Sequence, residues 1–304
     1  MLGGKSLAFG KLLIKQYKPY LFVLPALIFY IIFVFVPIAE TFKLSFFEWN
    51  GASPVKTYIG LENFLNLLED DVFMISLKNT VIWTIIAVAF PLLIGLVLSN
   101  ILVTGKIKFS AVFEVAYFMP NVLSVVVIGI IWSWIFLPDN GILTQMVKMI
   151  GLETVRTDWL GNSNLVLYCL LLAASWGYFG FCMVVFISSL KSIDKSYFEA
   201  ATIDGANAFQ TFIKITIPSM KNSINFMLLY TIISSLKVFD IVNVMTKGGP
   251  YHSSEVIATY LYTQVFQLNN VGYGSSIAIA LTVIVMVFSV IYMMISEKNS
   301  KGGV

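Results

Sequence analysis

The feature that most constrains this chain is the recurrence of long apolar stretches along its length. Six of them come close to or exceed the roughly 20 residues that an α-helix needs to cross the hydrocarbon core of a bilayer. Because lipid offers no partner for backbone groups, each segment must form its hydrogen bonds internally, and all six are predicted to be helices. The predicted spans are residues 20–39, 81–99, 115–136, 165–187, 226–244 and 277–295.

Charged residues are scarce in this sequence. They make up 12% of the 304 residues, against about 25% in soluble domains, so we predict an all-α integral membrane protein. Only the fifth predicted span contains charged residues, Lys237 and Asp240. The formal net charge of +3 is small and the lysines are scattered, which argues against a nucleic-acid partner.

The distribution of lysines predicts the orientation in the membrane. Lys5, Lys11, Lys15 and Lys18 precede the first span, and the positive-inside rule places that end in the cytoplasm. The first span is longer than the apolar region of a signal peptide and lacks a cleavage site after it, so we predict an uncleaved anchor. After six crossings both termini are cytoplasmic, and the same side receives Lys106, Lys108, Lys191, Lys195, Lys214, Lys221, Lys298 and Lys301.

Several site types are excluded by residue usage. His252 is the only histidine, which rules out a multi-histidine metal site. Cys169 and Cys182 fall within one apolar span and are predicted to be free thiols. The GGKS sequence from Gly3 to Ser6 lacks the strand and the upstream glycine of a phosphate-binding loop. The chain itself is therefore predicted to hold no metal and no nucleotide.

The segment EAATIDGANAFQTFIKITIP, from Glu199 to Pro218, is a mixed-polarity stretch between the fourth and fifth predicted spans. Ser196 and Glu199 fit a capping box at the start of a short helix, and Gly205 fits a left-handed turn that ends it. Pro218 marks the turn into the fifth span. The second helical piece is predicted to carry an apolar stripe of Phe209, Phe212 and Ile213.

This segment resembles the EAA signature of ABC importer permeases. In that signature EAA is followed by three residues, a glycine, nine residues, an isoleucine, one residue, a leucine and a proline. Ile217 stands where leucine is usual, and both side chains are bulky aliphatics. The positions that match are Glu199, Ala200, Ala201, Gly205, Ile215 and Pro218.

The resemblance extends from about Gly60 to the end of the sixth span and is closest to the carbohydrate-uptake, MalF/UgpA-like subgroup, because of the GGP segment at residues 248–250. It implies a type I permease core with six transmembrane helices and a cytoplasmic coupling loop at residues 194–218. The implied division is a cytoplasmic tail (1–19), a first helix with its outer loop (20–72), the permease core (73–296) and a second cytoplasmic tail (297–304). The residues implied to couple to an ATPase are Glu199, Ala200, Ala201, Asp204, Gly205, Ala206, Phe212, Ile215 and Pro218.

The resemblance also implies a set of partners in a bacterial or archaeal cytoplasmic membrane. These are a second homologous permease in a heterodimer, two cytoplasmic ATPase subunits that hold ATP and Mg, and an extracytoplasmic sugar-binding protein. In this arrangement the chain is not an enzyme. Its loop at residues 194–218 would dock into an ATPase and transmit the closure of the ATPase pair to the membrane helices, and the small Ala200 and Ala201 would allow a close approach.

Polar groups within the spans are candidates for the solute pathway because they are costly to bury in a bilayer. Sugars need hydrogen-bonding groups together with aromatic faces, and the third, fourth and fifth spans offer both. A competing structural explanation for Lys237 and Asp240, which we favour, is that they pair at i, i+3 on one helix. The candidate pathway residues are Asn121, Ser124, Trp176, Gly177, Tyr178, Ser234, Ser235, Lys237 and Asp240.

Three other functions remain open at this point. An ion-gradient-driven secondary carrier would fit the spans but has few intramembrane charges to support it. A membrane-embedded enzyme would need a cluster of nucleophiles or acid–base groups, which one histidine and few carboxylates within the spans do not supply. A permease of the same family for another solute, such as glycerol phosphate, is disfavoured only by the lack of a basic cluster facing the pathway.

Overall fold

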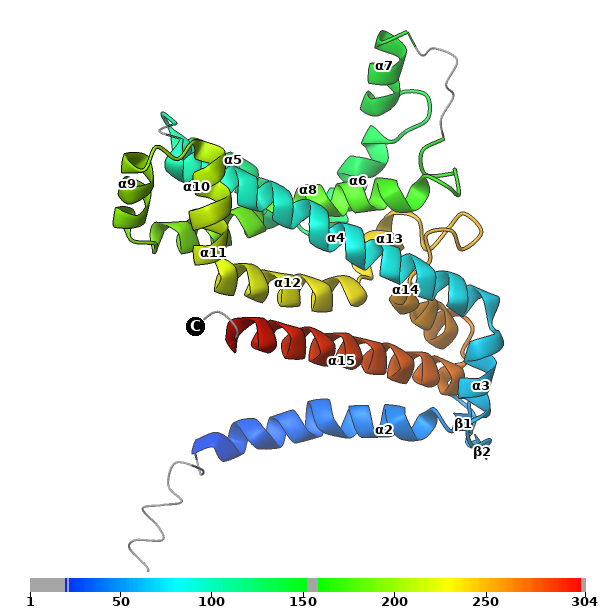
Figure 1. Cartoon of the computed structure of the whole chain (residues 1–304). Helices are drawn as coiled ribbons and strands as arrows, with labels where there is room; N and C mark the ends of the chain where they lie inside the picture. The colour runs from blue at the N-terminus through cyan, green and yellow to red at the C-terminus, as the bar shows by residue number, and fades with distance from the viewer. Residues whose placement is uncertain (1–19, 21, 106, 152–157, 302–304) are drawn as a thin grey trace, which may run out of the picture.

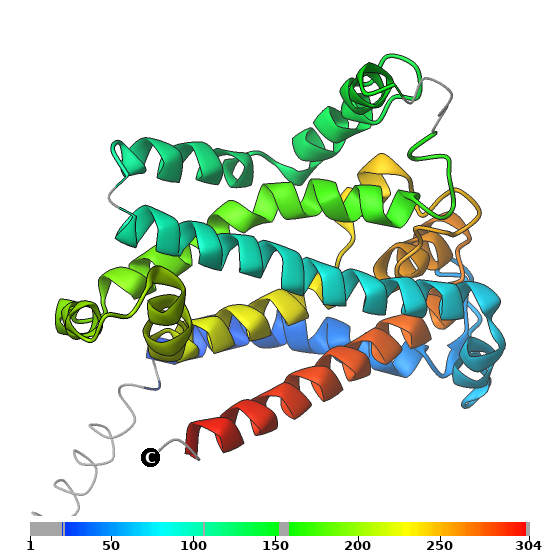
Figure 2. The same cartoon turned by 45° about the horizontal axis from the view of Figure 1, so that its top comes forward.

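The computed structural model describes residue 20 and residues 22–105, 107–151 and 158–301. The predicted tail at residues 1–19 lies outside these residues, as does Lys106. Within them the chain is a layer of helices with two distinct ends. The short helices α9 (Lys195–Ile203) and α10 (Ala208–Thr211) lie at one end, and α3 (Glu62–Glu69) lies at the opposite end with the strands β1 (Phe47–Glu48) and β2 (Thr57–Tyr58) (Figures 1 and 2).

Four of the predicted spans are continuous helices of sufficient length. The first is Phe22–Leu44, which includes a π-helical turn η1 (Ile31–Phe35) and α2 (Val36–Leu44). The others are α4 (Asp71–Thr104), α8 (Val166–Lys191) and α15 (Val271–Lys301). All four are apolar enough to cross a bilayer, so the prediction of helical spans is confirmed for these segments.

The third predicted span is not one helix. It consists of α5 (Ser110–Val122) and α6 (Val125–Ile135), which meet at an angle of 97°. The two residues between them are extended, and the Ser124 hydroxyl accepts a hydrogen bond from the Val127 backbone N–H at 3.3 Å. Ser124 therefore acts as the N-cap of a new helix, and the prediction of one continuous helix over residues 115–136 is wrong.

The fifth predicted span is also interrupted. Helix α12 (Lys221–Leu236) has 16 residues, which at 1.5 Å per residue is about 24 Å and shorter than the hydrocarbon core. The chain then leaves the helical path at Lys237 and resumes in α13 (Asp240–Met245). The described residues thus contain four candidate spanning helices, or five if the bent α5–α6 pair counts as one, in place of the six predicted.

Helices α4 and α8 pack along each other at the centre of the molecule, with α5 and α12 against them. Glycines permit this close packing. A Cβ atom on Gly95 in α4 would lie 2.7 Å from the Cβ of Cys182 in α8, and one on Gly180 would collide with the carbonyl oxygen of Tyr117 in α5. Cys169 and Cys182 are free and buried, as predicted.

The periphery is apolar and exposed. Helix α2 contacts α15, and the two lie side by side in both views (Figures 1 and 2). No part of the apolar window of the first span is buried within the chain, and only 6% of that of the last span is. Such a surface fits lipid or another apolar subunit.

At the end that carries α3, the carboxylate of Asp70 links the start of α4 to α14 (Ile257–Tyr262) and α15. Asp70 caps α4 by accepting hydrogen bonds from the backbone N–H groups of Val72 and Phe73, and its other oxygen accepts from the hydroxyls of Tyr260 and Tyr273. Tyr260 belongs to α14, which continues into the π-helical turn η3 (Thr263–Gln267) before α15. Burial alone would raise the pKa of Asp70, but the four hydrogen bonds together hold it below its usual value.

Candidate functional site

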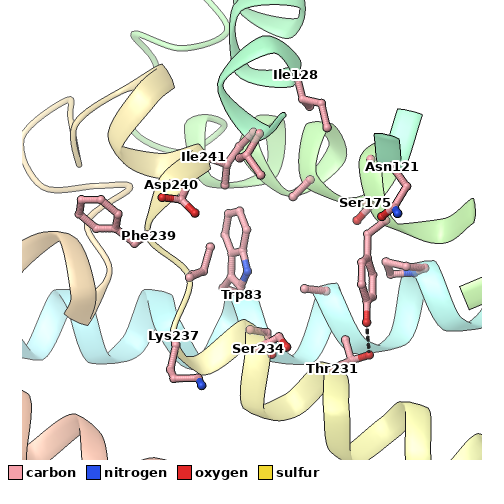
Figure 3. A pocket seen from close by; sticks show the side chains of 18 of the residues that line it. Trp83, Asn121, Ile128, Ser175, Thr231, Ser234, Lys237, Phe239, Asp240 and Ile241 are labelled. Atoms are coloured by element: carbon pink, nitrogen blue, oxygen red, sulfur yellow. Dashed lines mark hydrogen bonds between the residues drawn. The ribbon is translucent and has the colours of Figure 1, made fainter. Parts of the chain in front are cut away.

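A pocket of about 330 Å³ lies where the two interrupted segments meet α4 and α8 (Figure 3). Both helix breaks, at residues 123–124 and 237–239, open onto it. The pocket is therefore bordered by helix ends as well as by side chains. Its lining consists of Trp83, Ala87, Pro91, Asn121, Leu123, Val125, Ile128, Ala174, Ser175, Gly177, Tyr178, Thr231, Ser234, Ser235, Lys237, Val238, Phe239, Asp240 and Ile241.

Most of the predicted pathway residues are brought together here. The ones that line the pocket are Asn121, Gly177, Tyr178, Ser234, Ser235, Lys237 and Asp240. Two others are not part of the lining. Ser124 is occupied as the cap of α6. Trp176 packs edge-to-face against Trp132, with ring centroids 6.0 Å apart, at the border of a hydrophobic cluster.

Lys237 and Asp240 do not pair. Among the described residues, lysine–carboxylate ion pairs join Lys43 to Glu40 and Lys191 to Glu114, and Figure 3 shows Lys237 and Asp240 directed apart. The predicted i, i+3 pairing is wrong because α12 ends at Leu236, so the two residues do not share a helix. Lys237 instead caps the C-terminus of α12, and Asp240 lies in the first turn of α13. Each charge thus complements the dipole of its own helix end.

Several lining residues were not predicted. Trp83 comes from α4, and its side chain is only 2% exposed. Ser175 precedes the predicted Trp176 by one position and faces the pocket in its place. Thr231 accompanies Ser235 one helical turn away. The period of 3.6 residues would have connected Thr231 with Ser235, but no sequence signal distinguishes Trp83 from a tryptophan at the membrane interface.

One hydrogen bond crosses the pocket between two helices. The hydroxyl of Tyr178 in α8 lies 2.9 Å from the Oγ1 of Thr231 in α12 (dashed line in Figure 3). Thr231 is 3% exposed, so the bond is shielded. Together with the indole ring of Trp83 and the amide of Asn121, these hydroxyls form a mixed lining of aromatic surface and directional polar groups. Such a lining suits a small polyhydroxylated solute.

The segment from Asp194 to Met220 forms a second candidate site, which we call the elbow. Its first helix, α9, is capped by Asp194, whose carboxylate accepts a hydrogen bond from the Ser196 backbone N–H at 2.9 Å. The predicted capping box of Ser196 and Glu199 is therefore wrong, because the helix begins two residues earlier. The hydrogen bond from Ser196 lowers the pKa of Asp194 below its usual value.

The turn at Gly205 is as predicted. Gly205 has φ +72°, and the backbone N–H groups of Ala206 and Gly205 donate to the carbonyls of Ala201 and Thr202. This is the hydrogen-bond pattern of a Schellman motif, in which glycine adopts the left-handed conformation at low cost. These two hydrogen bonds and the left-handed Gly205 give the turn between α9 and α10 a defined backbone conformation.

The second half of the elbow has its own cap. Asn207 and Gln210 form a reciprocal capping box, with hydrogen bonds of 2.9 and 3.0 Å, at the start of α10. A π-helical turn η2 (Phe212–Thr216) and a short α11 (Ile217–Ser219) continue to Met220. This capping box was not predicted, although Asn followed three residues later by Gln is a recognisable signal.

The elbow is anchored on one side and exposed on the other. Met220 is fully buried in a cluster that includes Leu92 and Phe186, and Phe212 packs against the same cluster. Ala201 is buried too, so it cannot receive a partner, contrary to expectation. Ile203 and Phe209 are 86% and 72% exposed. The placement of the predicted coupling residues is as follows: Glu199, Ala200, Asp204, Gly205 and Pro218 are exposed, whereas Ala206, Phe212 and Ile215 are half-buried.

Comparison with known proteins gives a consistent result for most of the chain. Residues 93–300 match the family model described as binding-protein-dependent transport system inner membrane component. A probable ABC transporter permease protein YurN of Bacillus subtilis is 35% identical over 90% of this chain and 94% of its own length. The arabinooligosaccharides transport system permease protein AraP of Halalkalibacterium halodurans is 29% identical over 95% of this chain and 90% of its own length.

A solved structure shares the fold. It is a bacterial ABC transporter involved in the import of the acidic polysaccharide alginate, with a TM-score of 0.83 at 22% identity over 94% of this chain and 97% of that chain. A second structure of a bacterial alginate ABC transporter, in complex with an alginate pentasaccharide-bound periplasmic protein, has a TM-score of 0.84 over 96% of this chain and 98% of that chain.

Proposed function

The chain belongs to the family of binding-protein-dependent transport system inner membrane components, the permeases of ABC importers, and from that premise we propose that it is one half of the translocation pathway of an ATP-driven saccharide importer. As a transport permease component it is not an enzyme. In the proposal an ATPase subunit binds the elbow and displaces it when the ATPase pair closes. The pocket holds the solute during its passage across the membrane.

One observation carries the proposal: the elbow and the pocket are joined by a single helix. The buried Met220 ends the elbow, and α12 begins at the next residue. The same helix contributes Thr231 and Ser235 to the pocket. Because a hydrogen-bonded helix is stiff along its axis, a displacement of the elbow would move these pocket residues.

The form of the elbow supports a docking role. Two capped helices around the turn at Gly205 present Ile203 and Phe209 to solvent while Met220 holds the base. Aromatic side chains, phenylalanine included, are enriched at protein interfaces, and the exposed Ile203 adds apolar surface beside Phe209. We propose that an ATPase subunit covers Ile203 and Phe209, with Glu199 and Ala200 beside them.

The proposed solute class is inferred from the names of related permeases and from the residues that line the pocket. The relatives include a diacetylchitobiose uptake system permease protein of Streptomyces coelicolor, 27% identical over 90% of this chain, and a multiple sugar-binding transport system permease protein of Streptococcus mutans, 27% identical over 94%. The mixture of Trp83, Tyr178, Asn121 and hydroxyls suits a saccharide. An osmoprotective compounds uptake permease protein of Synechocystis, 31% identical over 88% of this chain, keeps an osmoprotective solute as the second candidate.

The rest of the assembly follows from the same proposal. A second permease of the same family would cover part of the exposed apolar surface and complete the pathway, and two ATPases would bind the elbows. The end with α9 would face the cytoplasm and the end with α3 would face outward, in agreement with the lysine distribution. The tails, the first helix with its outer loop and the permease core keep the boundaries given above.

The direct test is reconstitution of the complete complex in lipid. Sugar-loaded binding protein should stimulate ATP hydrolysis, and labelled sugar should accumulate only with ATP present. Phe209→Ser should uncouple the two activities, and Phe266→Ser, which changes an exposed phenylalanine at the opposite end, is the matched control. Uptake by this chain alone, driven by a proton gradient without ATP, would refute the proposal.

A further inference from the structure

We propose that Trp83 of α4 and Ser175 of α8 select the solute in the pocket, and that the indole N–H of Trp83 donates a hydrogen bond to a hydroxyl oxygen of the saccharide. The inference rests on the proposed function, because it assumes that the pocket holds the solute during transport. It assigns the contact to two buried side chains that have no hydrogen-bonding partner among the described residues.

Other polar groups of the pocket lining are already satisfied within the chain. The hydroxyls of Tyr178 and Thr231 are bonded to each other at 2.9 Å, and the Ser235 hydroxyl donates to the carbonyl of Ile232 at 3.0 Å. These groups are hydrogen-bonded without any solute. The groups that need a partner from the pocket are therefore found among the remaining lining residues.

The indole nitrogen of Trp83 is a buried donor without an acceptor. The side chain is 2% exposed, and its Nε1 forms no hydrogen bond with any residue that the structure describes. An indole nitrogen has one hydrogen to donate and cannot accept. Because buried polar groups are almost always hydrogen-bonded, the unpaired N–H indicates that its acceptor comes from outside the chain.

The pocket is the route by which an acceptor can reach this nitrogen. Trp83 is part of the pocket lining, and Figure 3 shows its ring nitrogen on the edge that faces away from Asp240. Trp132 of α6 provides the contrast within the described residues. Its Nε1 also lacks a partner, but that atom is sealed from the surroundings, whereas the Nε1 of Trp83 is not.

Ser175 is a second buried polar group of this kind. It is 3% exposed and lines the pocket, and its hydroxyl has no hydrogen-bonding partner in the described part of the chain. Serines within helices commonly donate to a carbonyl of the preceding turn, as Ser99 does to Leu96 at 2.8 Å. A serine hydroxyl both donates and accepts, so Ser175 complements the hydroxyl groups of a saccharide.

The start of α6 adds further donors to the same pocket. The Ser124 hydroxyl accepts only from the Val127 N–H, and the first N–H groups of a helix have no acceptor within it. Val125, the first residue of this 11-residue helix, is part of the pocket lining. The positive end of the helix dipole favours an electron-rich atom nearby. This helix start and Trp83 both call for an oxygen that accepts hydrogen bonds.

Water is the competing partner for Trp83 and Ser175, because ordered water commonly satisfies polar groups in cavities. A water molecule would complete their hydrogen bonds without any selection among solutes. A saccharide contact makes a sharper demand, because the effect of losing the Trp83 N–H must depend on one particular hydroxyl group of the solute. This dependence distinguishes the two occupants.

The test uses the complete complex in proteoliposomes with saturating binding protein. The probe is the labelled oligosaccharide that the wild-type complex accumulates with ATP, chosen from a panel led by diacetylchitobiose and arabinotriose. Trp83→Phe should lower the maximal uptake rate by at least about threefold. The half-saturating concentration of the binding protein should stay within about twofold, because the Trp83 side chain is buried and does not lie on a docking surface.

Trp132→Phe is the matched control for the loss of ring volume. It removes an equally large ring and an equally unpartnered N–H, but at a position outside the pocket lining. Its uptake should stay within about twofold of wild type, while thermal unfolding in detergent should show a similar loss of stability for both variants. An equal fall in uptake for the two variants would refute the contact.

Ser175→Ala tests the second group with a smaller change in volume, and it carries the test if Trp83→Phe does not assemble. Its maximal uptake rate should also fall by at least about threefold. Ser99→Ala removes a fully buried serine of α4 that bonds within its own helix, and it should leave uptake within about twofold. Wild-type uptake by Ser175→Ala would refute its role.

Monodeoxy derivatives of the probe separate the solute contact from water and from a structural effect. For the derivative that lacks the contacted hydroxyl, wild-type uptake should already be slow, and Trp83→Phe should slow it no further. An equal loss from Trp83→Phe for every derivative would refute the inference while the proposed function stands. If the wild-type complex accumulates no member of the panel with ATP, the proposed function fails and the inference fails with it.

Discussion

The hydroxyl of Tyr178 in α8 lies 2.9 Å from Oγ1 of Thr231 in α12, and this bond joins a central helix of the molecule to the helix that leaves the elbow. Any displacement of α12 relative to α8 must stretch or break it. The proposed mechanism requires α12 to move with the elbow, so this bond should change during the transport cycle. It is also part of the pocket lining, so breaking it would change the polar groups offered to the solute.

Removal of this bond should impair transport without dismantling the protein. Tyr178→Phe leaves the Thr231 hydroxyl buried without its partner, a cost of about 1–3 kcal/mol in the state that contains the bond. We expect uptake to fall by about 5-fold or more, with normal assembly by size-exclusion chromatography. In a double-mutant cycle with Thr231→Val the two effects should not add; fully additive losses would show that the two residues act separately.

The turn of the elbow should tolerate no side chain at Gly205. No atom lies within 4 Å of a Cβ built there, so Gly205→Ala tests conformation alone, and the left-handed backbone would cost roughly 1–2 kcal/mol. We expect ATPase stimulation to drop while membrane insertion is unchanged. Gly151→Ala, at φ +84° with equally open space but far from the elbow in sequence, is the control. Equal effects from the two substitutions would contradict the assigned role.

Two glycines of α8 should respond differently to enlargement. A Cβ on Gly180 would meet the backbone of Tyr117, which cannot move aside, whereas one on Gly177 would meet only the end of the Ile128 side chain, at 2.7 Å. Gly180→Ala should therefore destabilise the α5–α8 contact by about 1–3 kcal/mol, and Gly177→Ala by less. Thermal unfolding of the two purified variants in detergent gives the comparison, and the reverse order would show that α5 and α8 pack otherwise.

The cluster around Asp70 should make the end of the molecule that carries α3 sensitive to acid. Because the folded-state pKa of Asp70 lies below its ordinary value of 3.8, its carboxylate contributes stability above that value, and the contribution is lost as the pH falls through the folded-state pKa. Asp70→Asn should lower the melting temperature at pH 7, and the difference from wild type should shrink below about pH 4. A difference that is constant between pH 7 and pH 3 would contradict this.

The sequence was sufficient for the four uninterrupted helices because a long apolar segment in lipid has almost no alternative to a helix. It was not sufficient for the two breaks. Apolar residues flank Ser124 on both sides, so hydropathy continues across the point where its hydroxyl starts a new helix. The charges of Lys237 and Asp240 are evident in the sequence, but their spacing suggested an ion pair on one helix. In the structure Lys237 ends α12 and Asp240 begins α13.

In the candidate sites too, features set by the local sequence could be predicted, whereas features set by tertiary packing could not. The signature around Gly205 identified the elbow and its left-handed turn, since only glycine adopts that backbone conformation at low cost. The choice of Asp194 over Ser196 as the cap depended on where the chain leaves α8, which the local sequence does not encode. The pocket residue Trp83 could not be predicted because its orientation depends on how α4 packs against α8, a tertiary contact.

In the proposed mechanism an ATPase subunit binds the elbow, and the movement of the elbow is transmitted through α12. The most direct measurement is site-specific cross-linking in the assembled complex with single cysteines at Phe209 in the elbow and, as the control, at Tyr58 at the opposite end. The native Cys169 and Cys182 are buried and should not react. We expect Phe209→Cys to cross-link to the ATPase and the cross-link to block ATP-driven uptake, while Tyr58→Cys should do neither. A complex that transports sugar with the Phe209→Cys thiol freely accessible to a soluble reagent in every nucleotide state would contradict it.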